Sequence, residues 1–377
     1  MRIGIDARFY GPRVGGGGIG RYVAELVTHL QLIDKKNEYV LFLKKDNFHE
    51  CVITNPNFYK QLVDVHWYTI AEQFRMPREV SHARVDFMHY PHWNVPIFSK
   101  TPFLVTIHDL ILLEDPKSAR ASTRGPIVHG FKYAGFRTVI ETAIHKSRHI
   151  ISVSEYTKDS ILNHFGIRPE KITVVHNGVQ PPKPSVRDVS LTSLGVYEPY
   201  FLYIGNAYPH KNLEMMLHAF SEFVRHFPHV QLVIAGRRDV FSRQLETEAE
   251  ELGIPIGSLR FIDLPTDNEI AALYQKAKLF IFPSRIEGFG IPPLEAMSYG
   301  TPVAAAMTSS LPEVLKDSAR FFEPDDIEAL TRIMQNAMSI NSNLETKVEK
   351  GKKLASSYSW QRATEATLNL YNNFRIL

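Results

Sequence analysis

The sequence contains a single cysteine, Cys51, among its 377 residues. One cysteine excludes an internal disulfide framework and any zinc site built from several cysteines. No apolar run reaches the roughly 18 residues that a membrane-spanning helix needs, and the N-terminus lacks the basic-then-apolar pattern of a signal peptide. We therefore expect a cytoplasmic protein.

The sequence also lacks a strong excess of either charge. Lys and Arg total 43 and Asp and Glu total 40, which gives a formal net charge of +3. This charge is too small to indicate nucleic acid binding by itself. Hydrophobic residues make up 44% and charged residues 22%, which argues against a disordered chain and a coiled coil. At about 100–200 residues per domain, the length favours two globular domains.

Short β-branched and aromatic runs alternate with helical patterns along the chain, which is typical of parallel α/β layers. In the first half, the expected strands are 2–5, 39–43, 86–89, 103–107, 149–153 and 172–176. In the second half they are 201–204, 230–234, 259–262, 279–282 and 303–306. Apolar residues spaced by three and four positions predict helices around 136–144 and 213–223, each with one buried face.

The two series of strands are separated by residues 177–184, which contain three prolines and a glycine. Proline continues neither a helix nor a strand interior, so we interpret this segment as an interdomain linker. It predicts one domain over 1–180 and a second over 181–359. The last segment, 360–377, has a helical pattern with Trp, Tyr and Phe, and such a terminal helix docks rather than frays.

A glycine-rich loop, Gly15 to Gly18 followed by Ile19 and Gly20, precedes an apolar helical pattern. Glycines let backbone N–H groups approach an anion, and the positive end of the helix dipole adds to this attraction. A dinucleotide site needs these glycines directly after the first strand and an acidic residue about twenty positions on, a spacing that is not met here. The alternatives are a nicotinamide site, a flexible structural loop, and a loop facing phosphate or acceptor, of which we favour the last.

Two glutamates, Glu287 and Glu295, flank a Gly-Phe-Gly turn and a Pro-Pro pair directly after an apolar strand. The turn exposes backbone amides, and a proline in the first turn opens a helix. A helix N-terminus at the carboxyl end of a parallel strand is where α/β sheets hold phosphate. We expect one glutamate to bind sugar hydroxyls and the other a ribose. The alternative is a capped surface helix with solvated glutamates.

Three further junctions carry charged or titratable residues. Lys211 follows Gly205 at the mouth of the second sheet, where its ammonium would neutralise a leaving diphosphate, the alternative being a solvated lysine in the first turn of a helix. Arg237 and Arg238 end the next strand and are either phosphate contacts or solvated. His108 closes strand 103–107 at the edge facing the expected cleft, so a functional role stands beside a structural one.

Taken in order, these motifs resemble family 4 of the GT-B glycosyltransferases. The resemblance spans residue 2 to about 371 and rests on Glu287-x7-Glu295 with Gly288-Phe289-Gly290, Gly18-Ile19-Gly20-Arg21-Tyr22, Gly205 through Lys211-Asn212, Ile107-His108-Asp109 and Val153-Ser154-Glu155-Tyr156-Thr157. It implies an α/β GT-B fold, with two Rossmann-like domains facing across a cleft. The N-terminal domain would bind the acceptor, the C-terminal domain the nucleotide sugar, and the final helix would cross back onto the first domain.

The resemblance also implies roles for single residues. Glu287 would hold the donor sugar's hydroxyls, Glu295 the ribose and Lys211 the departing diphosphate, and His108 would line the reaction centre. The implied donor-binding residues are Gly17, Gly18, Gly205, Arg237, Arg238, Gly288, Phe289, Gly290, Leu294 and Glu295. Many relatives carry an arginine several residues before the lysine, where this chain has Asn206, and Arg237 or Arg238 would supply that charge. No metal or other cofactor is implied, which agrees with the absence of an Asp-x-Asp triplet.

The segment 117–148 contains seven Lys or Arg residues against one acid, Glu141, with apolar residues interleaved. Such a segment suits peripheral contact with anionic lipid, each charge near the surface contributing on the order of 1 kcal/mol. The alternative is a solvated or acid-paired helix face. A polyprenyl-linked glycan acceptor at the inner face of the membrane is consistent with the first interpretation.

Together these observations and the resemblance favour a glycosyltransferase that moves a hexose from a nucleotide sugar onto a glycan or lipid-linked acceptor of a bacterial surface polysaccharide. The resemblance implies transfer with retention at the anomeric carbon, and it favours GDP-mannose as the donor. Catalysis would rest on orientation and on stabilising the charge of the leaving phosphate, because no side-chain pair resembles a dedicated nucleophile and base. Two alternatives stay open. One is a GT-B sugar-nucleotide epimerase, and the other is a non-catalytic module that binds nucleotide sugars.

Overall fold

The computed structural model describes residues 1–11, 17–115, 126–182, 189–339 and 344–374, except for the side chains of 126–132. The chain divides into two compact units. Unit 1 comprises Met1–Leu110, Ser122–Gly178 and Ser359–Leu377, and unit 2 comprises Ile111–Ala121 and Val179–Tyr358. The division therefore falls within the predicted linker, between Gly178 and Val179, and the C-terminal helix belongs to unit 1.

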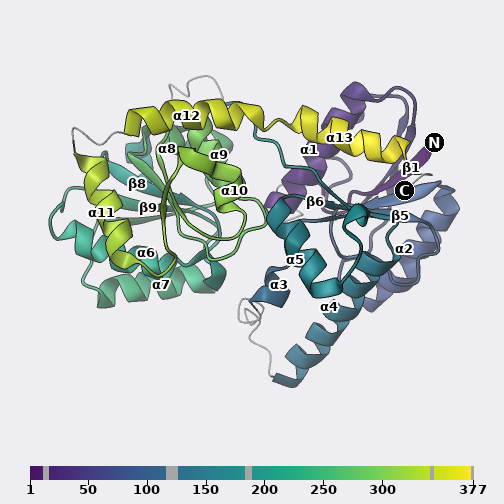
Figure 1. Cartoon of the computed structure of the whole chain (residues 1–377), viewed down its shortest axis with the longest axis horizontal. Coiled ribbons are helices and arrows are strands. Elements are labelled where there is room, and N and C mark those ends of the chain that lie inside the picture. The colour runs from purple at the N-terminus through teal and green to yellow at the C-terminus, as the bar shows by residue number, and fades with distance from the viewer. Residues whose placement is uncertain (12–16, 116–125, 183–188, 340–343, 375–377) are drawn as a thin grey trace. The chain divides into compact units, whose positions relative to one another are not determined.

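Unit 1 is built on a seven-stranded parallel sheet in the order β3-β2-β1-β4-β5-β6-β7. Its strands are β1 (Arg2–Asp6), β2 (Glu38–Leu43), β3 (Phe58–Leu62), β4 (Phe87–Tyr90), β5 (Phe103–Ile107), β6 (His149–Ser152) and β7 (Ile172–Val174). Its helices are α1 (Gly18–Ile33), α2 (Ile70–Ala83), α4 (Pro126–Lys146), α5 (Glu155–Phe165), the 3-10 turn η2 (Pro169–Lys171) and α13 (Trp360–Asn372). In Figure 1, α1 and α13 lie side by side.

Unit 2 is built on a six-stranded parallel sheet in the order β10-β9-β8-β11-β12-β13. Its strands are β8 (Tyr200–Ile204), β9 (Gln231–Gly236), β10 (Leu259–Asp263), β11 (Leu279–Phe282), β12 (Val303–Ala306) and β13 (Arg320–Phe322). Its α-helices are α3 (Ile111–Glu114), α6 (Leu213–Val224), α7 (Val240–Glu251), α8 (Asp267–Lys276), α9 (Ile291–Ser298), α10 (Leu311–Leu315), α11 (Ile327–Met338) and α12 (Leu344–Ser357). Short 3-10 turns occur at η3 (Leu191–Leu194), η4 (Pro209–Lys211) and η5 (Lys316–Ser318).

Each unit therefore has the Rossmann-like parallel sheet that the sequence predicts. All eleven predicted strands are present. The bounds of β5, β11 and β12 are as predicted, the other eight differ at one or both ends, and β3 and β13 were not predicted. β3 forms the outer edge of its sheet and only Phe58 is buried in it, and β13 is an edge strand of three residues. Short or exposed edge strands lack the continuous apolar run that marks a buried parallel strand.

Several helices begin at side chains that satisfy their first N–H groups. Thr69 caps α2 by accepting from the N–H of Glu72, and Asp239 and Thr266 form capping boxes at α7 and α8. The helix predicted around 213–223 is α6, in which every predicted apolar position is buried. These local signals fix where the helices start and which face packs on the sheet.

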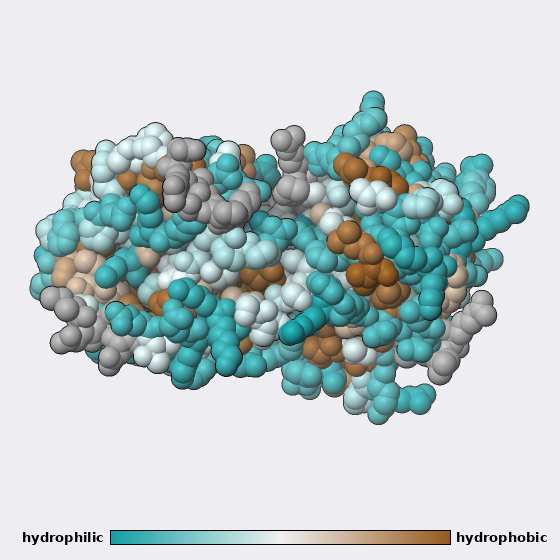
Figure 2. Space-filling view, turned by 90° about the horizontal axis from the view of Figure 1, so that it is seen from above, coloured by the Kyte–Doolittle hydropathy of each residue, from teal (hydrophilic) through white to brown (hydrophobic). Residues whose placement is uncertain are grey.

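Within the described part of the chain, no helix is long and apolar enough to cross a membrane. On the face shown in Figure 2, apolar groups form separate patches bordered by polar side chains.

Candidate active site

Lys211 and Glu287 form a partly buried ion pair in unit 2. The Nζ atom of Lys211 lies 2.5 Å from Oε1 of Glu287, and the two side chains are 14% and 11% exposed. The interpretations of a solvated lysine and a solvated Glu287 are therefore wrong. Because an ammonium carries three donors, this pair leaves Lys211 two N–H groups for a further acceptor.

Lys211 is positioned by the 3-10 turn η4, which follows β8. The turn ends at Asn212, whose backbone lies in the left-handed region with φ 58°. The side-chain amide of Asn212 donates to the carbonyls of Pro283, at 3.2 Å, and Pro324, at 2.8 Å. One buried amide thus ties η4 to the segments that follow β11 and β13.

Glu287 is held by the segment after β12. Its backbone N–H donates to Oγ of Ser309 at 3.0 Å, and Oγ of Ser310 donates to its carbonyl at 2.9 Å. The N–H of Arg285 donates to the carbonyl of His210 at 2.8 Å, which joins the Glu287 loop to η4. Burial lowers the pKa of His210 to about 4, so its ring is neutral at ordinary pH.

Ser309 and Ser310 are supporting residues that sequence reasoning missed, and Asn212 was recognised as part of a motif but given no role. The available signal was their position, because the two serines follow the apolar strand β12 at its carboxyl end. Polar residues at the carboxyl ends of parallel strands lie where such sheets bind ligands.

The Gly-Phe-Gly turn leads directly into α9. Gly290 is the N-cap, with φ 88°, a conformation that glycine adopts without strain. The side chains of Phe289 and Leu294 are 4% and 0% exposed, so they pack in the core and leave only backbone atoms for a donor contact. Gly288 is buried as well. Pro292 and Pro293 have no N–H, so the backbone N–H groups near this helix N-terminus come mainly from the Gly-Phe-Gly turn and Ile291. A helix N-terminus of this kind can bind phosphate.

Glu295 lies in α9, one turn beyond that N-terminus. Its Oε2 accepts a hydrogen bond from the Tyr274 hydroxyl at 3.2 Å, and the residue is half-buried. A carboxylate has acceptor capacity beyond one such bond, so contact with ribose hydroxyls stays a prediction that this geometry permits.

Gly205 directly follows β8, Gly236 is the last residue of β9, and the backbones of the two glycines approach closely. A Cβ atom on Gly236 would lie 2.0 Å from the carbonyl oxygen of Gly205, and one on Gly205 would lie 2.6 Å from the hydroxyl of Tyr203. Gly205 also has φ 156°. Side chains are thus excluded where the chain passes from β8 towards η4.

Both Arg237 and Arg238 are exposed. Arg238 forms an ion pair with Glu246 on α7, and its backbone N–H donates to Oδ1 of Asp263 at 2.9 Å. Its guanidinium is therefore engaged by a helix of its own unit. The predicted phosphate contact of either arginine stays a prediction.

His108 lies in unit 1 at the carboxyl end of β5. Its Nε2 is 2.9 Å from the carbonyl oxygen of Pro91, and because a carbonyl only accepts, Nε2 carries the hydrogen and Nδ1 is an acceptor. Burial lowers the pKa of His108 to about 4. The edge of the Tyr22 ring packs against it, with ring centroids 4.8 Å apart. His108 is therefore a neutral imidazole with one tautomer.

The predicted glycine loop is described from Gly17 onward, and Gly15 and Gly16 lie outside the described residues. Gly17 is the N-cap of α1 with φ 88°. A Cβ atom on Gly17 or Gly18 would meet nothing within 4 Å, whereas one on Gly20 would lie 2.1 Å from the carbonyl oxygen of Gly11. The close approach that requires glycine is thus at Gly20, whereas Gly17 and Gly18 are exposed.

The basic segment 117–148 is described only in part. The side chains of Lys117, Arg120, Arg124 and Lys132 lie outside the described residues. Arg137 pairs with Glu141 at 3.1 Å on the exposed face of α4. Lys146 donates to the carbonyl of Ile97, and Arg148 lies over the ring of Phe374.

Among the described residues, no group of three or more His, Cys, Asp or Glu side chains is placed to hold a metal ion. Independence of metal stays a prediction.

Comparison with known proteins identifies the class of enzyme. Residues 16–182 match the family model described as Glycosyltransferase Family 4, and residues 193–354 match the model described as Glycosyl transferases group 1. The fold is similar to that of a sucrose-phosphate synthase from Thermosynechococcus elongatus, with a TM-score of 0.77 at 18% identity, covering 100% of this chain and 99% of that one. It is also similar to Anabaena Alr3699/HepE in complex with UDP-glucose, with a TM-score of 0.74 at 16% identity, covering 98% and 99%.

Two parallel-sheet units and these matches define a GT-B glycosyltransferase. Among curated proteins, the chain is 26% identical to the O-antigen chain mannosyltransferase B of Escherichia coli, over 94% of this chain and 95% of that protein. It is 25% identical to the O-antigen chain mannosyltransferase RfbU of Salmonella typhimurium, over 85% and 87%. The chain belongs to the family 4 glycosyltransferases.

Proposed function

We propose that this glycosyltransferase moves mannose from GDP-mannose, with retention at the anomeric carbon, onto a glycan or polyprenyl-linked acceptor in the synthesis of a bacterial surface polysaccharide. The names of the two O-antigen relatives support the sugar and the pathway class. The observation that carries the proposal is the Lys211–Glu287 pair beside the N-terminus of α9.

The pair suits a diphosphate leaving group. Breaking the bond between sugar and phosphate puts negative charge on the departing nucleoside diphosphate. Lys211 would stabilise that charge by donating the N–H groups that Glu287 does not use. The amides of Phe289 and Gly290 would also donate to the diphosphate, and the positive end of the α9 dipole would attract it. The turn that carries Lys211 and the backbone of Glu287 are held before the reaction by the contacts of Asn212, Ser309 and Ser310.

Glu287 would have two tasks. It holds Lys211 in place, and its second carboxylate oxygen would accept hydrogen bonds from hydroxyls of the donor sugar. Glu295 would bind the ribose. His108 of unit 1 would line the reaction centre as a neutral acceptor through Nδ1, and Gly17 and Gly18 would approach the phosphates. Arg237 and Gly205 complete the proposed donor contacts.

A panel of nucleotide sugars tests the donor. A bound donor raises the melting temperature in proportion to the logarithm of its concentration over Kd, so we expect the largest rise with GDP-mannose. A larger rise with a UDP-sugar would overturn the donor assignment and leave the glycosyltransferase reaction standing.

The same donor distinguishes the alternative functions. Incubation with GDP-mannose alone gives slow release of GDP if the enzyme is a transferase. An isomerised nucleotide sugar would indicate an epimerase, and binding without any release of nucleotide would indicate a silent binding module. EDTA is expected to leave transfer unchanged, because no metal is proposed in the mechanism.

Peripheral membrane contact through 117–148 is part of the proposal. Anionic lipid attracts such a basic segment by on the order of 1 kcal/mol per charge. Sedimentation with anionic liposomes, and with neutral liposomes as the control, is expected to show binding to the anionic ones alone. Equal binding to both, or to neither, would contradict it.

A further inference from the structure

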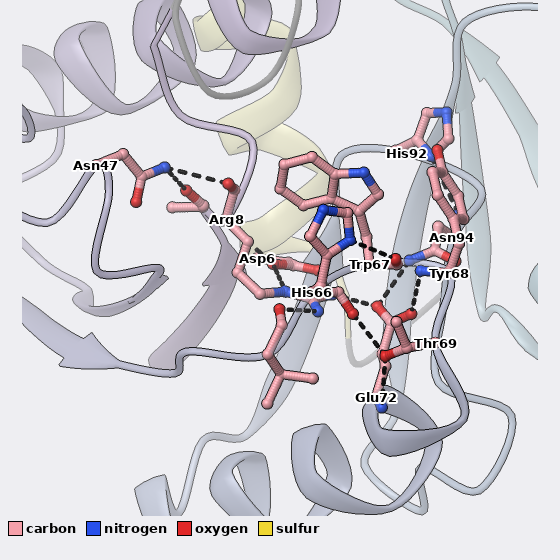
Figure 3. A network of polar contacts seen from close by, with 12 residues as sticks. Asp6, Arg8, Asn47, His66, Trp67, Tyr68, Thr69, Glu72, His92 and Asn94 are labelled. Atoms are coloured by element: carbon pink, nitrogen blue, oxygen red, sulfur yellow. Dashed lines mark hydrogen bonds and ion pairs between the residues drawn. The ribbon is translucent and has the colours of Figure 1, made fainter.

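Unit 1 contains a buried group of charged and amide side chains that the proposed donor chemistry does not use. Arg8 is 0% exposed and donates to both carboxylate oxygens of Asp6, at 2.8 and 2.6 Å, and to Oε1 of Glu72 at 2.5 Å. Asn94 donates to the same Glu72 oxygen at 2.7 Å. Figure 3 shows these residues converging between the loop after β1 and the start of α2.

This group holds the loop that carries Tyr68 in a strained backbone conformation. The second oxygen of Glu72 accepts from the backbone N–H of Tyr68 at 2.9 Å. Tyr68 has φ 62°, which is rare for a bulky residue, and yet it is 53% exposed. The loop is further closed by a hydrogen bond from the Thr69 hydroxyl to the carbonyl of His66. Residues with strained backbones cluster at ligand-binding and catalytic sites. Here a buried network holds the strain, and the strained residue carries an exposed aromatic ring, which is the combination expected of a binding site.

Tyr68 is one end of an aromatic strip that consists of Phe9, Trp67, Tyr68, His92 and Trp93. Ring centroids lie 4.5 Å apart in Phe9–Trp67 and in His92–Trp93, 5.4 Å in Phe9–His92, and 5.3 Å in Tyr68–Trp93. Phe9 and His92 are buried and form the base, whereas Trp67 and Trp93 are half-buried. Tyr68 is therefore the exposed ring of the strip, and the half-buried Trp93 beside it also packs on Phe136, with ring centroids 4.8 Å apart.

The strip lies at the topological switch point of the unit 1 sheet. Phe9 follows β1 and His92 follows β4, and these two strands are neighbours. From β1 the chain builds outward to β2 and β3 on one side, and from β4 to β5, β6 and β7 on the other. Open α/β sheets bind ligands outside the carboxyl ends of the strands at such a point.

We infer that the aromatic strip is the subsite that binds a hexopyranose ring of the acceptor, with Tyr68 and Trp93 stacking on the apolar face of the sugar. A pyranose ring has a C–H face that packs on an aromatic ring and a rim of hydroxyls that needs polar neighbours. Tyr and Trp supply large, rigid contact area with a polar tip at low entropic cost. The inference rests on the proposed function, since a donor bound by unit 2 leaves this site for the second sugar.

Arg8, Asp6, Glu72 and Asn94 are then positioning residues. A buried ion pair contributes little net stability against an apolar replacement, but it can specify one arrangement of the chain. Here that arrangement is the loop that carries Tyr68.

Intrinsic fluorescence gives a binding assay that needs no turnover. Trp67 and Trp93 are two of the three tryptophans in the sequence, so a sugar on the strip changes the emission directly. The probes are α-mannotriose, maltotriose and lactose, titrated without any nucleotide. The test variant is Tyr68→Gly, because glycine accepts the positive φ and the fold is kept. Tyr68→Phe keeps the ring, and Tyr59→Ala removes another tyrosine of unit 1, one that is 47% exposed.

We expect a saturable change with at least one probe for the wild type, Tyr68→Phe and Tyr59→Ala. For Tyr68→Gly we expect Kd to rise by up to about tenfold, the value that one aromatic stacking contact gives. No saturable change in the wild type, or an unchanged Kd in Tyr68→Gly, would overturn the inference. The rise in melting temperature with nucleotide sugar is measured on the same proteins, so failure of the donor site is seen separately.

Discussion

Lys211 and Glu287 stand 76 positions apart in the sequence and share a hydrogen bond of 2.5 Å between Nζ and Oε1. The contact joins the junction after β8 to the junction after β11, which are neighbouring strands of the sheet. Each residue is kept there by a different set of backbone contacts, so the pair is part of a preformed site. Binding of a diphosphate is expected to add to this arrangement without reorganising it.

Replacement of Lys211 by alanine is expected to lower kcat for donor turnover by about 10²–10³, the range found when one preformed charge stabiliser is removed. Lys276→Ala is the matched control, because its ion pair with Glu198 is half exposed. Release of GDP measures turnover, and circular dichroism checks that the fold is kept. Equal rates for Lys211→Ala and Lys276→Ala would remove Lys211 from the mechanism.

Gly20→Ala is expected to destabilise unit 1 by about 1–3 kcal/mol, the usual cost of overpacking. The added Cβ would stand 2.1 Å from a backbone oxygen that cannot move away cheaply. Gly18→Ala is the control, since a Cβ there meets nothing within 4 Å. Urea unfolding followed by tryptophan emission measures the difference, because all three tryptophans belong to unit 1. Similar midpoints for the two variants would count against the close approach of Gly20 to Gly11.

Arg8→Met is expected to lower the free energy of unfolding of unit 1 by about 3–5 kcal/mol, because it leaves two buried carboxylates without their cation. Arg332→Met in unit 2 removes an exposed pair with Glu328 and is expected to cost about 0–1 kcal/mol. Thermal and urea unfolding of both variants provide the comparison. If Arg8→Met lowers the free energy of unfolding as little as Arg332→Met does, the contacts of Arg8 shown in Figure 3 are not formed in solution.

Acid is expected to destabilise the protein because three histidines are held neutral in the folded chain. Burial lowers the pKa of His108 and His210 to about 4 and that of His89 to about 3, whereas an unfolded histidine titrates near pH 6.5. Between these values the unfolded chain binds protons that the folded chain does not bind. Stability is therefore fully present above about pH 6.5 and is lost as the pH falls towards about 4.

Urea unfolding across this pH range measures how the free energy of unfolding changes with pH. His210→Gln is expected to reduce this dependence on pH, because it removes one of the groups whose pKa burial lowers. A free energy of unfolding that does not vary between about pH 6.5 and about pH 4 would contradict the buried neutral histidines.

Much of the fold could be predicted from local patterns. The buried strands of both sheets are continuous apolar runs, and α6 shows its buried face in the spacing of its apolar residues. β3 and β13 could not be found in this way, because an edge strand is half exposed and its identity is set by its neighbour in the sheet.

The sequence predicts which residues lie at the candidate site, but it does not predict which of them are in contact. The positions of Lys211 and Glu287 at strand ends follow from the motifs, but their pairing depends on which strands are adjacent. Arg8 and Glu72 gave no local signal, because an arginine in a turn and a glutamate in the first turn of a helix are ordinarily solvated, and only the tertiary structure buries these two. The αL backbone of Tyr68 was equally hidden, since no glycine marks it.

A crystal structure with a bound nucleoside diphosphate sugar tests the central claim most directly. The diphosphate is expected within hydrogen-bond distance of Lys211 Nζ and of the amides of Phe289 and Gly290, with a sugar hydroxyl on Glu287. A donor bound elsewhere on the molecule, with the Lys211–Glu287 pair untouched, would contradict the account.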